Sequence, residues 1–171
     1  MTEASKPKSG MSTAVIVLIV IAAGGVPALG VVSALGIYGM TRYLREAKTA
    51  EGRAEATMLA RGVVRCAATQ GRGGAPTLPP SSAKVPASLS EVGKRKYMST
   101  PADWSDPTFR CAGFSMGAPQ YFQYEWEKRD DAGGVARATA DLDGDGAPDV
   151  TIEVPVTCDA SECQAGALIS R

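Results

Sequence analysis

The chain has 171 residues, its 18 basic side chains are balanced by 18 acidic ones, and it contains no histidine. A neutral chain without a long basic run lacks the positive face that nucleic-acid binding requires, so no nucleic-acid partner is expected. The absence of histidine excludes Ser-His-Asp and Cys-His catalysis and every His-ligated metal. Because the sequence also shows no convergent set of polar residues, we do not expect an enzyme.

The N-terminal part of the chain changes abruptly from polar to apolar. Residues 1–10 form a polar, leader-like segment, and the run Met11–Met40 then contains no charged residue. A bilayer core is crossed by about 20 apolar residues, whereas the apolar core of a cleaved signal peptide has only about 7–15. We therefore predict that residues 11–40 form a retained transmembrane helix and that the membrane is a partner.

Residues 41–68 contain no proline and continue this span as an amphipathic helix. The helical period predicts one apolar stripe on it. The members of the stripe are Leu44, Ala47, Ala54, Met58, Leu59, Val63 and Cys66. Because most of these side chains are small, a sheet is expected to lie close against the helix.

The remaining residues, 69–171, are predicted to form a sheet domain. Residues 69–93 are rich in Gly, Pro and Ser, which indicates a long surface loop. Four strands are predicted after it, over residues 109–116, 121–127, 135–142 and 150–156.

Alternation of apolar and polar residues along these segments, with short turns between most of them, favours an antiparallel meander. In residues 121–127 the alternating side chains Phe122, Tyr124 and Trp126 are interpreted as core, and a sugar-stacking or docking face is the alternative. The predicted fold class is α+β. One long N-terminal helix, half in the membrane and half amphipathic, packs on a small antiparallel sheet of about four strands.

Four cysteines follow the apolar run, which suggests two disulfides in an oxidising compartment. Three pairings are possible. We favour Cys158–Cys163 as a C-terminal loop and Cys66–Cys111 as a link from the helix end to the sheet, and four reduced thiols are the alternative. By count, Arg42, Arg45 and Lys48 after the span would favour a cytoplasmic C-terminus, but the cysteines favour the opposite side, and we rely on them.

The densest polar cluster is the sequence DLDGDGAPD, residues 141–149. Asp141, Asp143, Asp145 and Asp149 have the spacing of the first, third, fifth and ninth positions of a calcium loop, and the Ala147 carbonyl has that of the seventh. The twelfth position is Ile152 rather than Glu, and no flanking helices are predicted, so this is not an EF-hand. We predict a candidate structural Ca²⁺ site. The alternative is an Asp/Gly hairpin turn without metal.

Three features resemble the type IV pilin and pseudopilin family over residues 11–156. ALGIYGMTRYLREAKTAEG is similar to the junction between membrane span and stalk in the pilin helix. APQYFQYEW followed by VARATADLDGDG is similar to the paired strands and Asp/Gly turn of pilin-like proteins, and the C-terminal cysteine pair is similar to the pilin disulfide loop. The resemblance implies assembly with pilin-like subunits through the N-terminal helix.

The resemblance also implies processing by a membrane peptidase, for which Gly10–Met11 is the fitting bond. The fifth residue after that bond is Val15, where the family usually has Glu. We therefore expect a minor or accessory subunit of a type IV pilus or type II secretion pseudopilus. It would be a single-pass inner-membrane protein whose C-terminal domain lies in the periplasm or outside the cell. The alternative is a non-assembling, membrane-anchored binding module with a calcium-stabilised loop.

Overall fold

The computed structural model describes residues 12–171, and the side chains of residues 13–38 and of Thr41 are outside the description. The leader-like segment and the bond Gly10–Met11 therefore lie outside the described residues, as do most side chains of the predicted membrane segment. Over the part of the chain that is described, no helix is long and apolar enough to cross a membrane. The chain divides into two units, Met1–Leu44 and Arg45–Arg171.

Helix α1 runs from Thr13 to Gln70 as one element. Its residues from Arg45 onward belong to the second unit and pack on the sheet. The helix ends where the backbone becomes left-handed at Arg72 and Gly73, with φ of 46° and 84°. The carbonyl of Ala67 accepts hydrogen bonds from the N–H groups of both Gly71 and Thr77, so the helix end is tied to the following loop.

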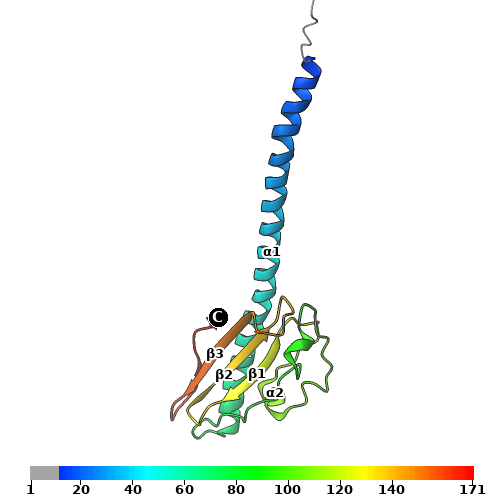
Figure 1. The fold of residues 1–171 in the computed structure, drawn as a ribbon. Coiled ribbons are helices and arrows are strands. Elements are labelled where there is room, and N and C mark those ends of the chain that lie inside the picture. Colours follow the sequence, from blue (N-terminus) through cyan, green and yellow to red (C-terminus); the bar gives the residue numbers. More distant parts are fainter. Residues whose placement is uncertain (1–11) are drawn as a thin grey trace, which may run out of the picture. The chain divides into compact units, whose positions relative to one another are not determined.

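The sheet is antiparallel and follows the chain order (Figure 1). Its strands are β1 (Gln123–Lys128), β2 (Gly133–Ala140), β3 (Val150–Cys158), β4 (Cys163–Ala165) and β5 (Ile169–Ser170). Strands β4 and β5 both pair with β3, one near each end of it. The predicted α+β class is confirmed, and three of the predicted segments form β1, β2 and β3. Strands β4 and β5 were not predicted, because strands of two or three residues are too short to show an alternation of apolar and polar residues.

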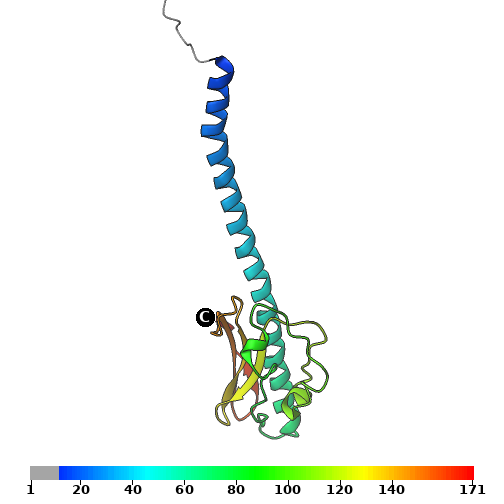
Figure 2. The same cartoon turned by 45° about the vertical axis from the view of Figure 1, so that its right-hand side comes forward.

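The core lies between the sheet and the C-terminal part of α1 (Figure 2). Tyr124 of β1 stands beside Ala138 of β2, which stands beside Ile152 of β3, and all three are fully buried. The next layer repeats the arrangement with Trp126, Ala136 and Val154. Because β2 contributes only alanines and Gly134 to this face, the aromatic rings of β1 and the aliphatic side chains of β3 can both reach the helix.

The predicted helix stripe is correct for three of its seven members. Leu59, Val63 and Cys66 are buried, whereas Leu44, Ala47, Ala54 and Met58 are exposed. The face on the sheet is Thr49, Gly52, Ala56, Leu59, Ala60, Val63 and Ala67. Residue 52 is glycine because a Cβ there would lie 2.7 Å from the ring of Phe122. The sheet therefore packs on the helix face that contains Gly52, where the two backbones can approach closely, and not on the face that contains Leu44 and Met58. Hydropathy does not predict this choice, because it does not measure how closely two elements can approach.

The strand predicted over residues 109–116 is wrong. Residues Pro107–Ala112 form helix α2 instead. Its N-cap is Asp106, whose carboxylate accepts the Thr108 N–H at 2.8 Å, and Gly113 ends it with a φ of 64°. An acidic N-cap, Pro at the first position and Gly after the last are strong helix boundary signals, and they override the aromatic composition of the segment.

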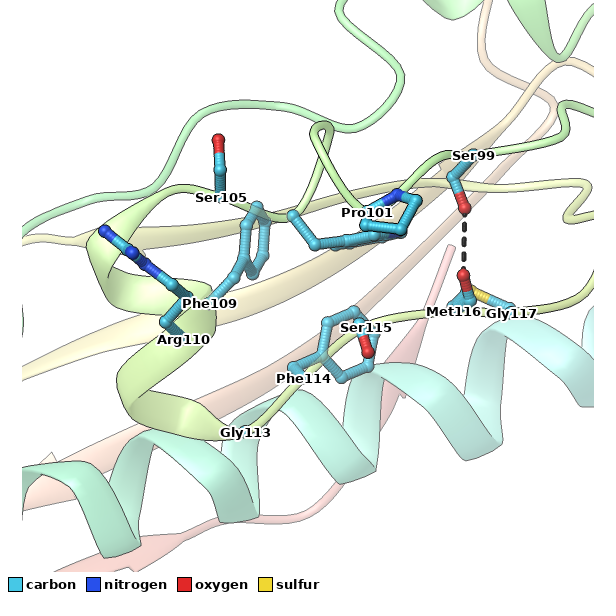
Figure 3. Close-up of a pocket in the computed structure, with 11 residues that line it drawn as sticks. Ser99, Pro101, Ser105, Phe109, Arg110, Gly113, Phe114, Ser115, Met116 and Gly117 are labelled. Carbon is cyan, nitrogen blue, oxygen red and sulfur yellow. Dashed lines mark hydrogen bonds between the residues drawn. The ribbon is translucent and has the colours of Figure 1, made fainter.

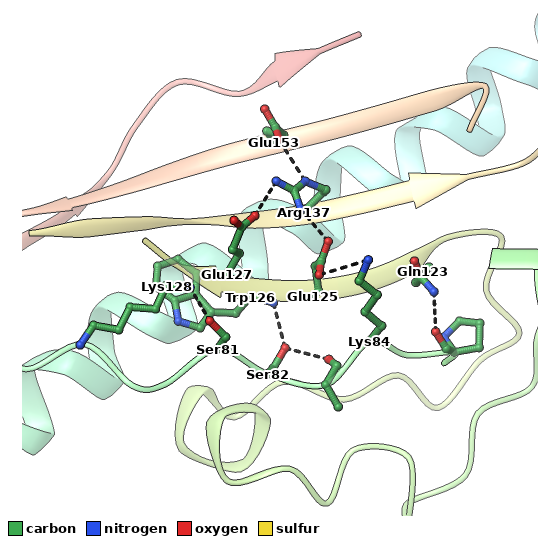
Figure 4. Close-up of polar contacts among 12 residues, drawn as sticks. Ser81, Ser82, Lys84, Gln123, Glu125, Trp126, Glu127, Lys128, Arg137 and Glu153 are labelled. Atoms are coloured by element: carbon green, nitrogen blue, oxygen red, sulfur yellow. Dashed lines mark hydrogen bonds and ion pairs between the residues drawn. The ribbon is translucent and has the colours of Figure 1, made fainter. Parts of the chain in front are cut away.

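The Gly/Pro/Ser-rich segment is a loop, as predicted, with one short 3-10 helix, η1 (Leu89–Glu91). Part of it runs along the outer edge of β1 (Figure 4). Val85 and Tyr124 exchange two backbone hydrogen bonds, and the Ser82 N–H donates to the Trp126 carbonyl. The loop therefore covers a sheet edge that would otherwise expose unpaired backbone groups.

The four cysteines form two disulfides, Cys66–Cys111 and Cys158–Cys163, the pairing favoured from the sequence. Cys158 and Cys163 are register partners on β3 and β4. Cys111 lies on α2 rather than on a strand, so the first disulfide joins two helices and does not tie α1 to the sheet.

Candidate metal centre

The acidic loop connects β2 to β3, and the structure brings three of its four carboxylates together. One oxygen from each of Asp141, Asp143 and Asp149 lies within 4.8 Å of the others. Asp141 is buried, Asp149 is half-buried and Asp143 is exposed. This is an oxygen-only, partly open group of the kind that hard divalent cations prefer.

Backbone amides of the loop hold two of these carboxylates in place. The Asp141 carboxylate accepts the N–H groups of Gly144 at 2.6 Å and Gly146 at 3.0 Å. The Asp149 carboxylate accepts the N–H groups of Leu142 at 2.5 Å and Asp143 at 2.9 Å. A carboxylate has about four acceptor positions, so these bonds orient the oxygens and leave room for a further donor or a cation.

The fourth carboxylate stands apart from the group. Asp145 is exposed and is not one of the three clustered side chains. Its carboxylate accepts the Ala147 N–H at 2.8 Å, and its own N–H donates to Asp143 at 3.2 Å. These two bonds shape the turn, and the Asp145 carboxylate itself lies outside the candidate centre.

Helix α1 adds a cation that the sequence analysis does not place there. The Arg45 guanidinium donates to Asp149 Oδ1 at 2.7 Å, across 104 positions of sequence. The N–H of Lys94 also donates to the Asp141 carbonyl at 3.1 Å, so a third segment packs on the loop. With three carboxylates against one guanidinium, the group keeps a net negative charge that favours a bound cation.

A second polar cluster lies where α1 meets the start of β1. Glu51 accepts the Tyr121 N–H at 2.8 Å and, more weakly, the Tyr124 hydroxyl at 3.4 Å. Burial raises the pKa of Glu51, and the hydrogen bonds from the two tyrosines offset only part of that effect. The ammonium groups of Lys48 and Lys96 lie 4.7 and 4.8 Å from the centre of the Tyr121 ring, which is cation–π distance.

A third cluster covers the sheet face opposite the helix (Figure 4). Arg137 on β2 donates to Glu125 and Glu127 at 2.7 Å each and to Glu153 at 3.0 Å. Burial disfavours the charged guanidinium, but the hydrogen bonds to the three glutamates outweigh it and raise the pKa of Arg137. Each of the three guanidinium nitrogens donates to a different glutamate, so the cluster links strands β1, β2 and β3.

Comparison with protein-family models, with curated proteins and with solved structures finds no match. The sequence patterns and the geometry described above are therefore the basis for the function proposed below.

Proposed function

We propose that the chain is a pilin-like, single-pass envelope protein, acting as a minor or accessory subunit of a type IV pilus or type II secretion pseudopilus. In this proposal the helix over residues 11–40 anchors the subunit and assembles with neighbouring subunits. The unit Arg45–Arg171 lies outside the cytoplasm and presents its sheet and loops.

One observation carries this proposal more than any other. The uncharged run Met11–Met40 is followed in the same helix, α1, by a segment after Arg45 that has one face buried under a small antiparallel sheet. Two disulfides in the same unit favour an oxidising compartment. The membrane assignment depends on the uncharged sequence alone, because the described helix residues are not apolar enough to cross a membrane.

The intact mass of the protein isolated from its native cells tests the proposal. Cleavage at Gly10–Met11 removes residues 1–10 and leaves a new Met11 N-terminus. We expect Gly10→Val to block this cleavage and Ser9→Ala, a neighbouring small change, to leave it intact. A full-length chain in the native protein would reject the processed-subunit assignment.

The second candidate function is a membrane-anchored binding module that does not assemble and whose loop is stabilised by calcium at the group of Asp141, Asp143 and Asp149. The two candidates have the same fold and differ in whether the subunits assemble through residues 11–40. Cysteine cross-linking within residues 11–40 in native membranes separates the two. Cross-linked ladders support assembly, whereas monomers at every position tested support the anchored module.

In both candidates we propose that the acidic loop binds Ca²⁺ as a structural ion. Bound calcium would raise the melting temperature, because a ligand that binds only the folded state stabilises it. We expect Asp143→Asn to remove this rise, since it deletes a clustered charge without changing the side-chain size. Asp145→Asn, whose carboxylate lies outside the group, should retain the rise. An unchanged melting temperature of the parent chain in millimolar calcium would show that the loop is a metal-free turn.

A further inference from the structure

A cleft of about 670 Å³ lies beside α2, between the loop that precedes this helix and the segment that follows it. Its volume is within the range of small-ligand sites, which is about 300–1,000 Å³. Trp104, Phe109 and Phe114 line it, and the Trp104 ring packs edge-to-face on the other two, with its centroid 5.1 Å from that of Phe109 and 5.4 Å from that of Phe114. None of these three residues is part of the acidic loop or of the polar clusters described above.

Among the residues that line the cleft, Arg110 is the charged one, and it lies at one end (Figure 3). Ser105 and the Arg110 side chain lie toward one end, with Phe109 between them and the rest of the cleft. Pro101, Phe114 and Met116 lie toward the other end, where the Ser99 hydroxyl donates to the Met116 carbonyl at 3.1 Å. A ligand that follows this arrangement has an apolar body and a polar head.

Two hydrogen-bond donors of the lining have no acceptor among the described residues. The indole Nε1 of Trp104 is buried and makes no hydrogen bond. Arg110 is exposed and makes no ion pair or side-chain hydrogen bond within the described part of the chain. An unmatched buried donor costs about 1–3 kcal/mol, so a ligand that brings an acceptor is favoured here over one that brings a donor.

The nearby acidic residues do not supply that acceptor. Asp103 already accepts the Thr100 N–H at 2.6 Å and the Thr100 hydroxyl at 3.0 Å. Asp106 accepts the N–H groups of Thr108 at 2.8 Å and Ala83 at 3.0 Å. Backbone amides therefore hold both carboxylates, and the positive charge of Arg110 stays available to an incoming anion.

We propose that this cleft binds a small carboxylate with an apolar body. The carboxylate lies at the Arg110 end, where the guanidinium can form two parallel hydrogen bonds to it. The apolar body lies along Phe114, Pro101 and Met116. The proposal is independent of membrane anchoring, assembly and calcium, since every residue in it belongs to the unit Arg45–Arg171.

The test uses the full chain in a non-ionic detergent with its tryptophans labelled with ¹⁵N. The chain has two tryptophans, and Trp104→Phe assigns the two indole signals. The probe is 4-phenylbutyrate, and 4-phenylbutanamide, which has the same shape without the charge, is its control. We expect a saturable shift of the Trp104 indole signal with the acid, and about tenfold weaker binding of the amide, as the loss of one charge-assisted contact predicts.

Two matched variants decide the role of the guanidinium. Arg110→Gln should bind the acid about tenfold more weakly, to the level of the amide. Arg129→Gln, at an exposed arginine in the turn after β1, should bind it as the parent does. The proposal is overturned by equal binding of acid and amide, by the absence of a saturable shift, or by an equal loss in both variants. Circular dichroism of each variant verifies that the fold is intact.

Discussion

At the scale of single residues, two half-buried charged side chains, Arg137 and Glu51, are held in different ways. Arg137 donates to three carboxylates, whereas Glu51 accepts from an amide and a hydroxyl and has no guanidinium or ammonium in hydrogen-bond contact among the described residues. The first arrangement neutralises charge that burial would penalise. The second leaves the penalty largely in place, and the raised pKa of Glu51 is its consequence.

Removing the central cation of the Arg137 cluster should destabilise the protein. Arg137→Gln leaves Glu125, Glu127 and Glu153 facing one another without a neutralising group. We expect a loss of about 1–3 kcal/mol in the free energy of unfolding, between the values for exposed and for buried pairs. Lys84→Gln is the control, because Lys84 is 52% exposed and 3.7 Å from Glu125. Equal urea midpoints for the two variants would contradict this view.

The pH dependence of stability should report Glu51. Its pKa is raised in the folded state, so the folded state binds this proton more tightly than the unfolded state does. The associated stability is fully present below the unfolded pKa and is lost as pH rises through the folded pKa. In the parent chain the free energy of unfolding should therefore fall as the pH rises above the unfolded-state pKa of about 4.5, and Glu51→Gln should make this fall less steep. Glu46→Gln, an exposed change on the same helix, should leave the slope unaltered.

At the scale of elements, the contact between α1 and the sheet depends on residues without bulk. A Cβ at residue 62 would lie 2.4 Å from the Ala112 carbonyl oxygen, and one at residue 52 would meet Phe122 and Ile152. Both positions are glycine, which lets α2 and the sheet approach the helix backbone. Interiors are close-packed, so the side chains around these glycines have little freedom to move away.

The neighbours Met58 and Leu59 provide a direct test of this contact. Leu59 is fully buried against the sheet, whereas Met58 is 57% exposed. We expect Leu59→Ala to lower the free energy of unfolding by about 2–5 kcal/mol, through lost burial and a cavity. Met58→Ala should change it by less than about 0.5 kcal/mol. Thermal unfolding followed by circular dichroism measures both, and a larger effect at Met58 would mean that the other helix face packs on the sheet.

At the scale of the whole folded unit, two disulfides constrain regions of different size. Cys66–Cys111 spans 45 positions and joins α1 to α2, whereas Cys158–Cys163 spans five and links adjacent strands. The larger loop also contains the segment that covers the edge of β1. The first disulfide therefore limits the unfolded chain far more than the second.

The loss of stability on removal of each disulfide should follow this difference in loop size. In the chain-entropy model, replacing both cysteines of Cys66–Cys111 with serine costs about 4 kcal/mol, and the same change at Cys158–Cys163 costs about 2 kcal/mol. Equilibrium unfolding of the two double variants measures the ranking. A larger loss at the C-terminal pair would show that native packing rather than unfolded-state entropy governs its contribution.

Local patterns were sufficient for much of the fold. Alternation along residues 121–127, 135–142 and 150–156 predicted β1, β2 and β3 to within a few residues, because period-two burial is a property of the strand itself. The same patterns failed at residues 109–116, where capping residues select a helix, and at the exposed members of the helix stripe. Three of the four acidic residues of the loop are brought together, but Arg45, the cation that meets them, is 104 positions from Asp149 and has no local signal.

The sequence by itself determined the α+β class, the three long strands and the acidic turn, and it favoured the two disulfide pairs, since each depends on residues close together in the chain or on a small number of possible pairings. Only the tertiary structure decided which helix face is buried, that Arg137 is enclosed by three glutamates, and that Trp104, Phe109 and Phe114 line one cleft. These three features depend on how closely separate elements approach one another. Steric contact at glycines and alanines determines that distance, and hydrophobic periodicity does not encode it.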